Sequence, residues 1–277
     1  LFQGAMKGLG RDKGLFDWLD SSVRFALHET GYEEVYTAAL LGCIENIRSG
    51  STMVLDYHYA HAREAGLDDA VMRAFEETGI RGLLGRAHTN VSQMPEGAQC
   101  PRVETEEQFF DDVERLQEKY GQHSRIGVCM APGIIWDLSE EGYRHCRTLA
   151  DRHGMIITMH TLETDDDNRF TQEVYGTNTM PFLARTGVLG PDFLAVHCVD
   201  MDEEDFRIFK EHDIKVSHNP VSNMILASGV APVPRMLDMG LTVFLATDGS
   251  ASNDTQDMME VLKTTALIHK CHLKDPT

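Results

Sequence analysis

The chain has 277 residues, and 42% of them are hydrophobic, which is enough to form the core of one large domain or two small ones. Its 44 acidic residues outnumber the 25 lysines and arginines, and the formal charge of −19 argues against nucleic acid or an anionic membrane surface as a partner. No apolar run approaches the roughly 20 residues of a membrane span, and the six scattered cysteines suit free thiols in a reducing compartment, so we expect a cytoplasmic protein.

Short apolar runs alternate with amphipathic segments along the whole chain. A helical or partly helical face over 15–27 precedes the first unit, and a polar loop is expected over 89–103. The hydrophobic pattern predicts strands over 51–57, 80–84, 126–131, the run that begins at Met155, 193–196, 214–217 and 241–246. It predicts helices over 33–49, 68–78, 104–120, 139–153, 171–186 with a break near Pro181, 203–212, 230–239 and 254–270.

This alternation of strand and helix is typical of a parallel sheet with crossover helices. Seven units at this length fit an α/β fold of the (β/α)8 barrel type with one strand missing, and residues 1–277 would form a single barrel domain. An open doubly wound sheet is the competing fold. It usually carries a Gly-rich phosphate turn after its first strand, and neither GxGxxG nor GxxxxGK[ST] occurs in this chain.

Titratable side chains follow four consecutive strands of the predicted sheet. His160 and Glu163 follow one strand, and His197, His218 and Asp248 follow the next three, about 20–40 residues apart, as one strand–helix unit requires. In a closed barrel these ends meet at one mouth, and imidazole and carboxylate are ligands that suit Zn²⁺ or Fe²⁺. The histidines could instead pack in the core or support the barrel mouth, Glu163 could be a solvated loop carboxylate, and Asp248 could cap the following helix.

Four segments resemble motifs of the amidohydrolase superfamily, in the right order. They are HTLE at 160–163, AVHC at 195–198, SHNPVSN at 217–223 followed by LASG at 226–229, and TDGSASN at 247–253. The chain looks most like the aminohydrolase branch, which includes methylthioadenosine/S-adenosylhomocysteine deaminases and s-triazine hydrolases. In that family strand 1 carries an HxH metal pair just upstream of a stretch that LFQ at 1–3 resembles. The resemblance therefore implies that strand 1, two metal ligands and the flanking β-sandwich lie outside the given chain.

The resemblance also implies a role for each residue at the mouth. His160 and Asp248 would bind one divalent metal ion, Zn²⁺ by preference and Fe²⁺ as the alternative. Asp248 would also take a proton from the attacking water, His197 would orient the hydroxide, and Glu163 would protonate a ring nitrogen of the substrate and pass a proton to the leaving amine.

Other features narrow the chemistry and leave alternatives open. No lysine lies in 126–135, so we expect one metal ion rather than a pair bridged by a carbamylated lysine, and no cytidine-deaminase signature occurs. Arg86, Trp136 and His218 lie past strand ends and are candidates for substrate binding, although packing roles are at least as good an explanation. His58 and His61 also lie past a strand end, without an assigned role.

We therefore expect a hydrolytic deaminase of an aminated N-heterocycle, acting as a homo-oligomer. The segment 131–136, APGIIW, lacks the substrate-binding histidine usual in nucleoside deaminases of this branch, so a purine, pterin or triazine fits as well as a nucleoside. Two alternatives remain open. One is a triazine-type hydrolase that displaces a leaving group other than an amine, and the other is a non-catalytic barrel scaffold that has lost its metal pair.

Overall fold

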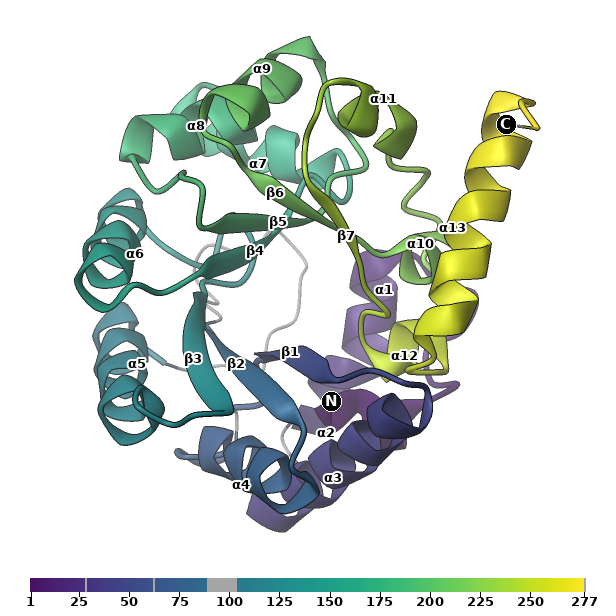
Figure 1. Cartoon of the computed structure of the whole chain (residues 1–277). Coiled ribbons are helices and arrows are strands. Elements are labelled where there is room, and N and C mark those ends of the chain that lie inside the picture. Colours follow the sequence, from purple (N-terminus) through teal and green to yellow (C-terminus); the bar gives the residue numbers. More distant parts are fainter. Residues whose placement is uncertain (28, 62, 89–103, 277) are drawn as a thin grey trace.

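A computed structural model describes residues 1–27, 29–61, 63–88 and 104–276 and places the strands in one parallel sheet. The loop expected over 89–103 lies outside the described residues. Neighbouring strands are bonded in chain order from β1 to β7, so the sheet curls around a central axis, as Figure 1 shows. The strands are β1 (Met53–His58), β2 (Arg81–Ala87), β3 (Ile126–Ala131), β4 (Ile157–Thr161), β5 (Phe193–His197), β6 (Lys215–His218) and β7 (Val243–Leu245).

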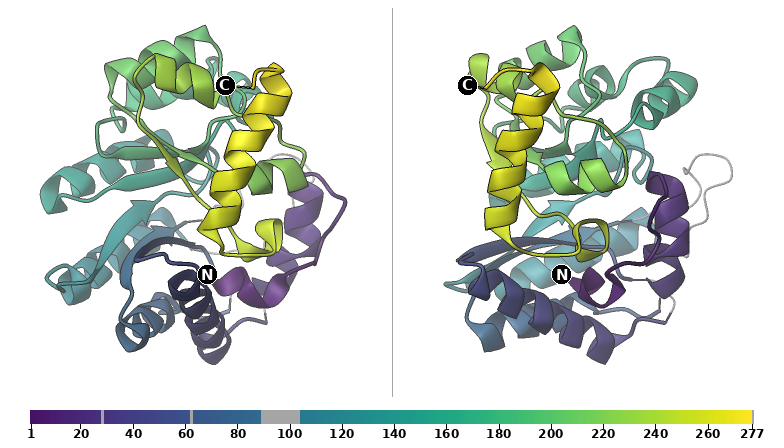
Figure 2. Two further views of the ribbon diagram at one scale, coloured as in Figure 1. Left: turned by 45° about the vertical axis from the view of Figure 1, so that its right-hand side comes forward. Right: turned by 90° about the vertical axis from the view of Figure 1, so that its right-hand side faces the viewer.

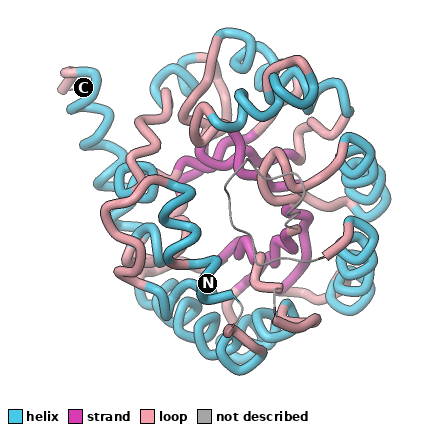
Figure 3. The backbone as a smooth tube through the Cα atoms, turned by 180° about the vertical axis from the view of Figure 1, so that it is seen from behind, coloured by secondary structure: helices cyan, strands magenta, loops and turns pink. Residues whose placement is uncertain are grey.

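Helices surround the outside of this sheet, and Figure 3 shows the same ring from the opposite side. A 3-10 helix, η1 (Phe2–Met6), is followed by α1 (Leu15–Ser21), α2 (Val23–Leu27), α3 (Tyr32–Arg48), α4 (Asp68–Thr78), α5 (Glu106–Tyr120), α6 (Glu140–His153), α7 (Asp166–Tyr175), α8 (Thr179–Thr186), α9 (Glu203–Glu211), α10 (Pro220–Ile225), α11 (Val233–Asp238), α12 (Ser250–Asn253) and α13 (Met258–Leu273). Helix α13 lies outside the β7 edge, beside α10 (Figure 2).

Alternate residues along the strands face opposite sides of the sheet. One set packs between the sheet and the surrounding helices, and the other faces the axis of the barrel. In β4 and β5, Ile157, Met159, Phe193 and Ala195 are fully buried in the layer between sheet and helices. Their neighbours in sequence point toward the axis, where Thr158, His160, Leu194 and Val196 line a cavity. The position of His160 is therefore set by the same alternation that buries Ile157 and Met159.

Residues of η1 connect the two edge strands of the sheet. The Gln3 side chain donates a hydrogen bond to the Tyr59 hydroxyl beyond β1 (2.6 Å) and accepts one from the Ala251 amide in α12 beyond β7 (3.2 Å). Phe2 is 1% exposed and packs edge-on against the rings of His58 and Tyr59. The stretch that resembles the segment after strand 1 thus packs as part of the barrel.

The architecture confirms the predicted incomplete (β/α)8 barrel, but three helical details were predicted wrongly. The break within 171–186 falls at Gly176–Asn178 rather than at Pro181. Gly176 ends α7 with a left-handed φ of 70°, whereas Pro181 lies in the first turn of α8, where its missing amide hydrogen costs no hydrogen bond. Helix α10 was not expected, because its six residues are too few for a helical period to show. The helix predicted over 254–270 is α13, which begins four residues later, at Met258, and the short helix α12, which precedes the predicted range, was not expected.

None of the helices in the described part of the chain combines the length and the apolarity that crossing a bilayer requires. Among the described cysteines, Cys43, Cys129, Cys146 and Cys198 are buried free thiols, and Cys271 is an exposed one.

Asp205 in α9 makes the stability of the fold depend on pH. Its side chain is 1% exposed and accepts a hydrogen bond from the Asp202 amide (2.8 Å). Burial raises the pKa of this carboxyl to about 7. The folded protein therefore holds a proton that the unfolded chain releases near pH 4, and the stabilisation is lost as the pH rises toward 7.

We expect Asp205→Asn, which keeps the acceptor oxygen but cannot ionise, to remove this dependence. Between pH 5 and pH 7 the unfolding free energy of the wild type should fall by about 2 kcal/mol relative to the variant, measured by urea denaturation. Glu211→Gln, at an exposed position at the end of the same helix, should follow the wild type. Parallel profiles for wild type and Asp205→Asn would contradict the prediction.

Candidate active site

A cavity of about 570 Å³ extends along the inside of the sheet and reaches the C-terminal ends of the strands. His160, Glu163, His197 and Asp248 all line it. They come from the ends of β4, β5 and β7 or from the turns that follow. The structure thus brings together the four residues for which the sequence analysis predicted metal binding or catalysis.

His160 is oriented by the backbone of Gly133. Its Nδ1 lies 3.3 Å from the Gly133 carbonyl oxygen, which also accepts from the His160 amide (3.2 Å). A carbonyl can only accept, so Nδ1 carries the proton and Nε2 has a free lone pair. The Tyr57 hydroxyl donates to the same carbonyl and accepts from the Gly133 amide, both at 2.7 Å, and the Tyr57 ring packs edge-on against the imidazole.

His197 carries its proton on the opposite ring nitrogen. The Asn223 amide donates to Nδ1 at 2.9 Å, so Nδ1 is the acceptor and the proton lies on Nε2. Nε2 faces two carboxylates, Glu163 Oε2 at 3.4 Å and Asp248 Oδ2 at 3.9 Å. The rings of His197 and His160 stack with their centroids 5.4 Å apart. His160 therefore presents the lone pair of Nε2 to the cavity, and His197 presents its Nε2–H.

Two of these residues adopt strained backbone conformations. His197 has a φ of 75° and Asp248 a φ of 62°, a region that non-glycine residues seldom occupy and that costs on the order of 1–3 kcal/mol each. At Asp248 this conformation accompanies a hydrogen bond from the Gly249 amide to Oδ1 (2.6 Å), while Oδ2 is the oxygen near His197. Strain of this kind is often found at functional sites, where it fixes the direction of a side chain.

Glu163 is 4% exposed and is held by one hydroxyl. Oε1 accepts a hydrogen bond from Ser228 (3.0 Å), while Oε2 is the oxygen near His197. Burial raises the pKa of the Glu163 carboxyl to about 7, and the proximity of Asp248 adds to the rise. A carboxyl that titrates near neutral pH can both donate and accept a proton under physiological conditions.

The pKa values of the other ionisable groups in the cluster are lowered, whereas that of Glu163 is raised. Burial lowers the pKa of His160 and of His197, so both imidazoles are neutral at pH 7. Burial alone would raise the pKa of Asp248, but the neighbouring imidazoles and the Gly249 amide outweigh it, and the pKa lies below its usual value. At neutral pH the cluster therefore holds one fixed carboxylate and one carboxyl that titrates.

The three candidates for substrate binding lie in different surroundings. Trp136 lines the cavity and contacts the rings of Phe16 and Phe170. His218 is buried and lies 5.4 Å from the His269 ring of α13, on the outer side of the sheet. Arg86 is 2% exposed and forms ion pairs with three carboxylates, those of Asp68, Glu104 and Asp112. Of the three, the described cavity lining includes Trp136 alone.

The sequence analysis overlooked the residues that hold the predicted ones in place. Tyr57, Gly133, Asn223 and Ser228 orient His160, His197 and Glu163, and the only signal for them was that each lies in or near a strand-end segment. It also gave no role to His58 and His61, which lie beside Asp68. Burial lowers the pKa of His58 to about 4 and that of His61 to about 3.

The donor set at the mouth fits a divalent metal ion. His160 Nε2 has a free lone pair because Nδ1 is engaged with Gly133, and Asp248 supplies a carboxylate. A neutral imidazole whose other nitrogen is bonded to a carbonyl is the usual arrangement of a metal-binding histidine. These two residues would form part of a catalytic metal site, which generally has about three protein ligands.

Comparison with known proteins decides the family. A model of the amidohydrolase family matches residues 1–277. The chain belongs to the amidohydrolase family. This result confirms the resemblance derived from the four strand-end motifs.

Curated relatives of this amidohydrolase include deaminases. It is 35% identical over 275 residues to a 5'-deoxyadenosine deaminase of Methanothermobacter thermautotrophicus, covering 98% of this chain and 60% of the relative. It is 34% identical over 274 residues to a 5-methylthioadenosine/S-adenosylhomocysteine deaminase of Nitratidesulfovibrio vulgaris, covering 98% of this chain and 58% of the relative. The chain thus spans about three fifths of the length of these relatives.

Two solved structures share the fold of this chain. An adenosine deaminase from Xanthomonas campestris with bound zinc superposes with a TM-score of 0.84 at 24% identity, covering 98% of this chain and 58% of the other. An atrazine chlorohydrolase from Arthrobacter aurescens, complexed with zinc, superposes with a TM-score of 0.86 at 22% identity, covering 97% and 62%. At these identities the comparison establishes the barrel architecture.

We expect Asn223→Asp to move the His197 proton from Nε2 to Nδ1, because a carboxylate can only accept a hydrogen bond from the ring. Long-range ¹H–¹⁵N NMR of the imidazoles should show Nε2–H for His197 in the wild type and Nδ1–H in the variant. His160, which keeps its bond to Gly133, should show Nδ1–H in both proteins and serves as an internal control. A wild-type His197 protonated at Nδ1 would contradict the assignment.

Proposed function

We propose that this protein is a metal-dependent hydrolase that removes the amino group from an aminated N-heterocycle. The proposal rests chiefly on Glu163, a buried carboxyl with a pKa near 7 that lies at the cavity beside His197 and the fixed carboxylate of Asp248. Hydrolytic deamination of a cyclic amidine needs a group that first gives a proton to a ring nitrogen and later gives one to the leaving amine.

His160 and Asp248 would hold the metal ion, for which we propose Zn²⁺, with Fe²⁺ as the alternative. When bound, such an ion supplies a hydroxide nucleophile at neutral pH. Zinc in the related adenosine deaminase and atrazine chlorohydrolase structures supports this choice.

Each side chain around the cavity would have its own role in proton transfer or hydrogen bonding. Glu163 donates its proton to the ring nitrogen, and Ser228, bonded to Oε1, keeps the other oxygen directed toward the reacting group. His197 donates from Nε2 to negative charge that develops on the attacking oxygen. Asp248 would accept the proton of the attacking oxygen at Oδ2, since Oδ1 is engaged by the Gly249 amide. Glu163 would relay this proton to the leaving amine, which departs as ammonia.

We propose an adenine-type or similar flat heterocycle as the substrate class. The names of the curated relatives, deaminases of 5'-deoxyadenosine and of methylthioadenosine, support an aminopurine ring. Segment 131–136 contains no histidine that could bind the ribose of a nucleoside. A Cβ at position 133 would lie 1.9 Å from Asp137 Oδ2, so this position accepts no side chain. Pterins and triazines therefore remain in the proposed substrate class.

We also propose that the protein is cytoplasmic and forms a homo-oligomer.

We expect Glu163→Gln to reduce the rate of ammonia release by a factor of about 10² to 10⁴, because glutamine cannot carry the proton. Purified full-length protein is loaded with Zn²⁺ and assayed on aminopurines, aminopurine nucleosides, pterins and triazines. Glu173→Gln, an exposed position in α7, should leave the rate unchanged.

The same panel separates the alternatives. Release of chloride or another non-amine group, with no ammonia, would replace the deaminase by a triazine-type hydrolase. No turnover on any compound by a folded, zinc-loaded protein would favour a non-catalytic scaffold. Full activity in Glu163→Gln would remove Glu163 from the mechanism.

A further inference from the structure

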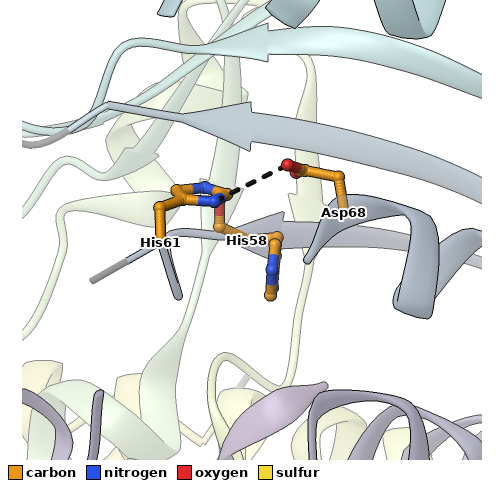
Figure 4. A group of neighbouring side chains, drawn as sticks. All are labelled: His58, His61 and Asp68. Carbon is orange, nitrogen blue, oxygen red and sulfur yellow. Dashed lines mark hydrogen bonds and ion pairs between the residues drawn. The ribbon is translucent and has the colours of Figure 1, made fainter. Parts of the chain in front are cut away.

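Three side chains at the end of β1 and the start of α4 lie close together. His58 ends β1, His61 follows it by three residues, and Asp68 is the first residue of α4. Figure 4 shows the imidazole of His61 directed toward the Asp68 carboxylate, with His58 beside them. One donor atom from each residue lies within 4.8 Å of the other two.

The separation between His61 and Asp68 is that of two ligands on one ion. His61 Nδ1 lies 3.6 Å from Asp68 Oδ2, which is longer than a hydrogen bond. Two donors at about 2.0–2.1 Å from a tetrahedral Zn²⁺ lie about 3.3 Å apart. The other nitrogen of His61, Nε2, lies 3.1 Å from the backbone carbonyl of His58, which directs Nδ1 toward Asp68 and leaves it with a lone pair.

The imidazole of His58 has no hydrogen-bond partner in the described structure. Its side chain is fully buried, and both Nδ1 and Nε2 lack a partner among the described residues. A buried polar atom without a partner costs on the order of 1–3 kcal/mol, so such atoms are rare unless a water or an ion satisfies them. A cation between His58, His61 and Asp68 would satisfy this imidazole.

The charges around the group favour a cation. Asp68 is fully buried, and its nearest cation is Arg86, 3.3 Å from Oδ2. Arg86 also pairs with Glu104 and Asp112, and Arg115 shares Asp112, so two guanidinium groups face three carboxylates. With both imidazoles neutral, the surroundings keep an excess of negative charge.

We propose that His58, His61 and Asp68 form a second divalent-metal site, distinct from His160 and Asp248, which takes Zn²⁺ and ties the end of β1 to the first turn of α4. Two imidazoles and one carboxylate are a donor set that suits Zn²⁺. The site would add an ion to the single metal expected from the sequence, and it does not depend on the proposed deamination.

The test counts Zn²⁺ in protein that lacks the first site. In His160→Ala/Asp248→Ala protein, equilibrium dialysis against Zn²⁺ followed by elemental analysis should still find about one ion per chain. Adding His58→Gln should weaken this binding at least tenfold, whereas adding His145→Gln, at an exposed position of α6, should not. Zn²⁺ should also raise the melting temperature of the double variant and lose that effect with His58→Gln.

Two results would overturn the site. One is the absence of bound Zn²⁺ in the folded double variant, and the other is equal affinity in the His58→Gln and His145→Gln proteins. If His58→Gln fails to fold, Asp68→Asn, which keeps the size of the side chain, replaces it in the same measurements. With Co²⁺ in place of Zn²⁺, the double variant should show the visible absorption expected for nitrogen and oxygen ligands. Adding Asp68→Asn should remove this absorption, and unchanged absorption would contradict the proposal.

Discussion

The carbonyl of Gly133 joins three strand ends and fixes the direction of His160. It accepts hydrogen bonds from the Tyr57 hydroxyl, from the His160 amide and from His160 Nδ1. These contacts connect β1, the turn after β3, and β4 at one point. The φ of 101° at Gly133 and the closeness of Asp137 Oδ2 leave room for no residue except glycine. The lone pair that His160 offers to a metal follows from this single backbone group.

The two histidines of the cavity have different functions because their partners differ. A carbonyl holds the proton of His160 on Nδ1, and the Asn223 amide holds that of His197 on Nε2. Identical side chains in stacked rings thus become a metal ligand and a hydrogen-bond donor. The strained backbone at His197 and Asp248 fixes the directions of two side chains that lie 3.9 Å apart, and the parallel ladder and buried layer behind the strands sustain that strain.

The repeating features of this protein could be predicted from its sequence. The strand over 126–131 and the helix over 68–78 were predicted with their observed bounds, because apolar period and capping residues determine them locally. His160, Glu163, His197 and Asp248 were found because strand ends in a barrel share one mouth. The residues that orient them were not found, since the contact between Tyr57 and Gly133 joins positions 76 residues apart. The ion pairs of Arg86 could not be predicted for the same reason, because its three carboxylate partners are distant in sequence and become neighbours only in the fold.

The account depends most on a metal ion held between His160 and Asp248, and anomalous diffraction tests this directly. Crystals of the full-length protein are grown with Zn²⁺ and measured on both sides of the zinc absorption edge. The account predicts an anomalous peak within about 2.0–2.2 Å of His160 Nε2 and of an Asp248 carboxylate oxygen. Crystals that bind Zn²⁺ elsewhere and show no peak between these two residues would contradict it.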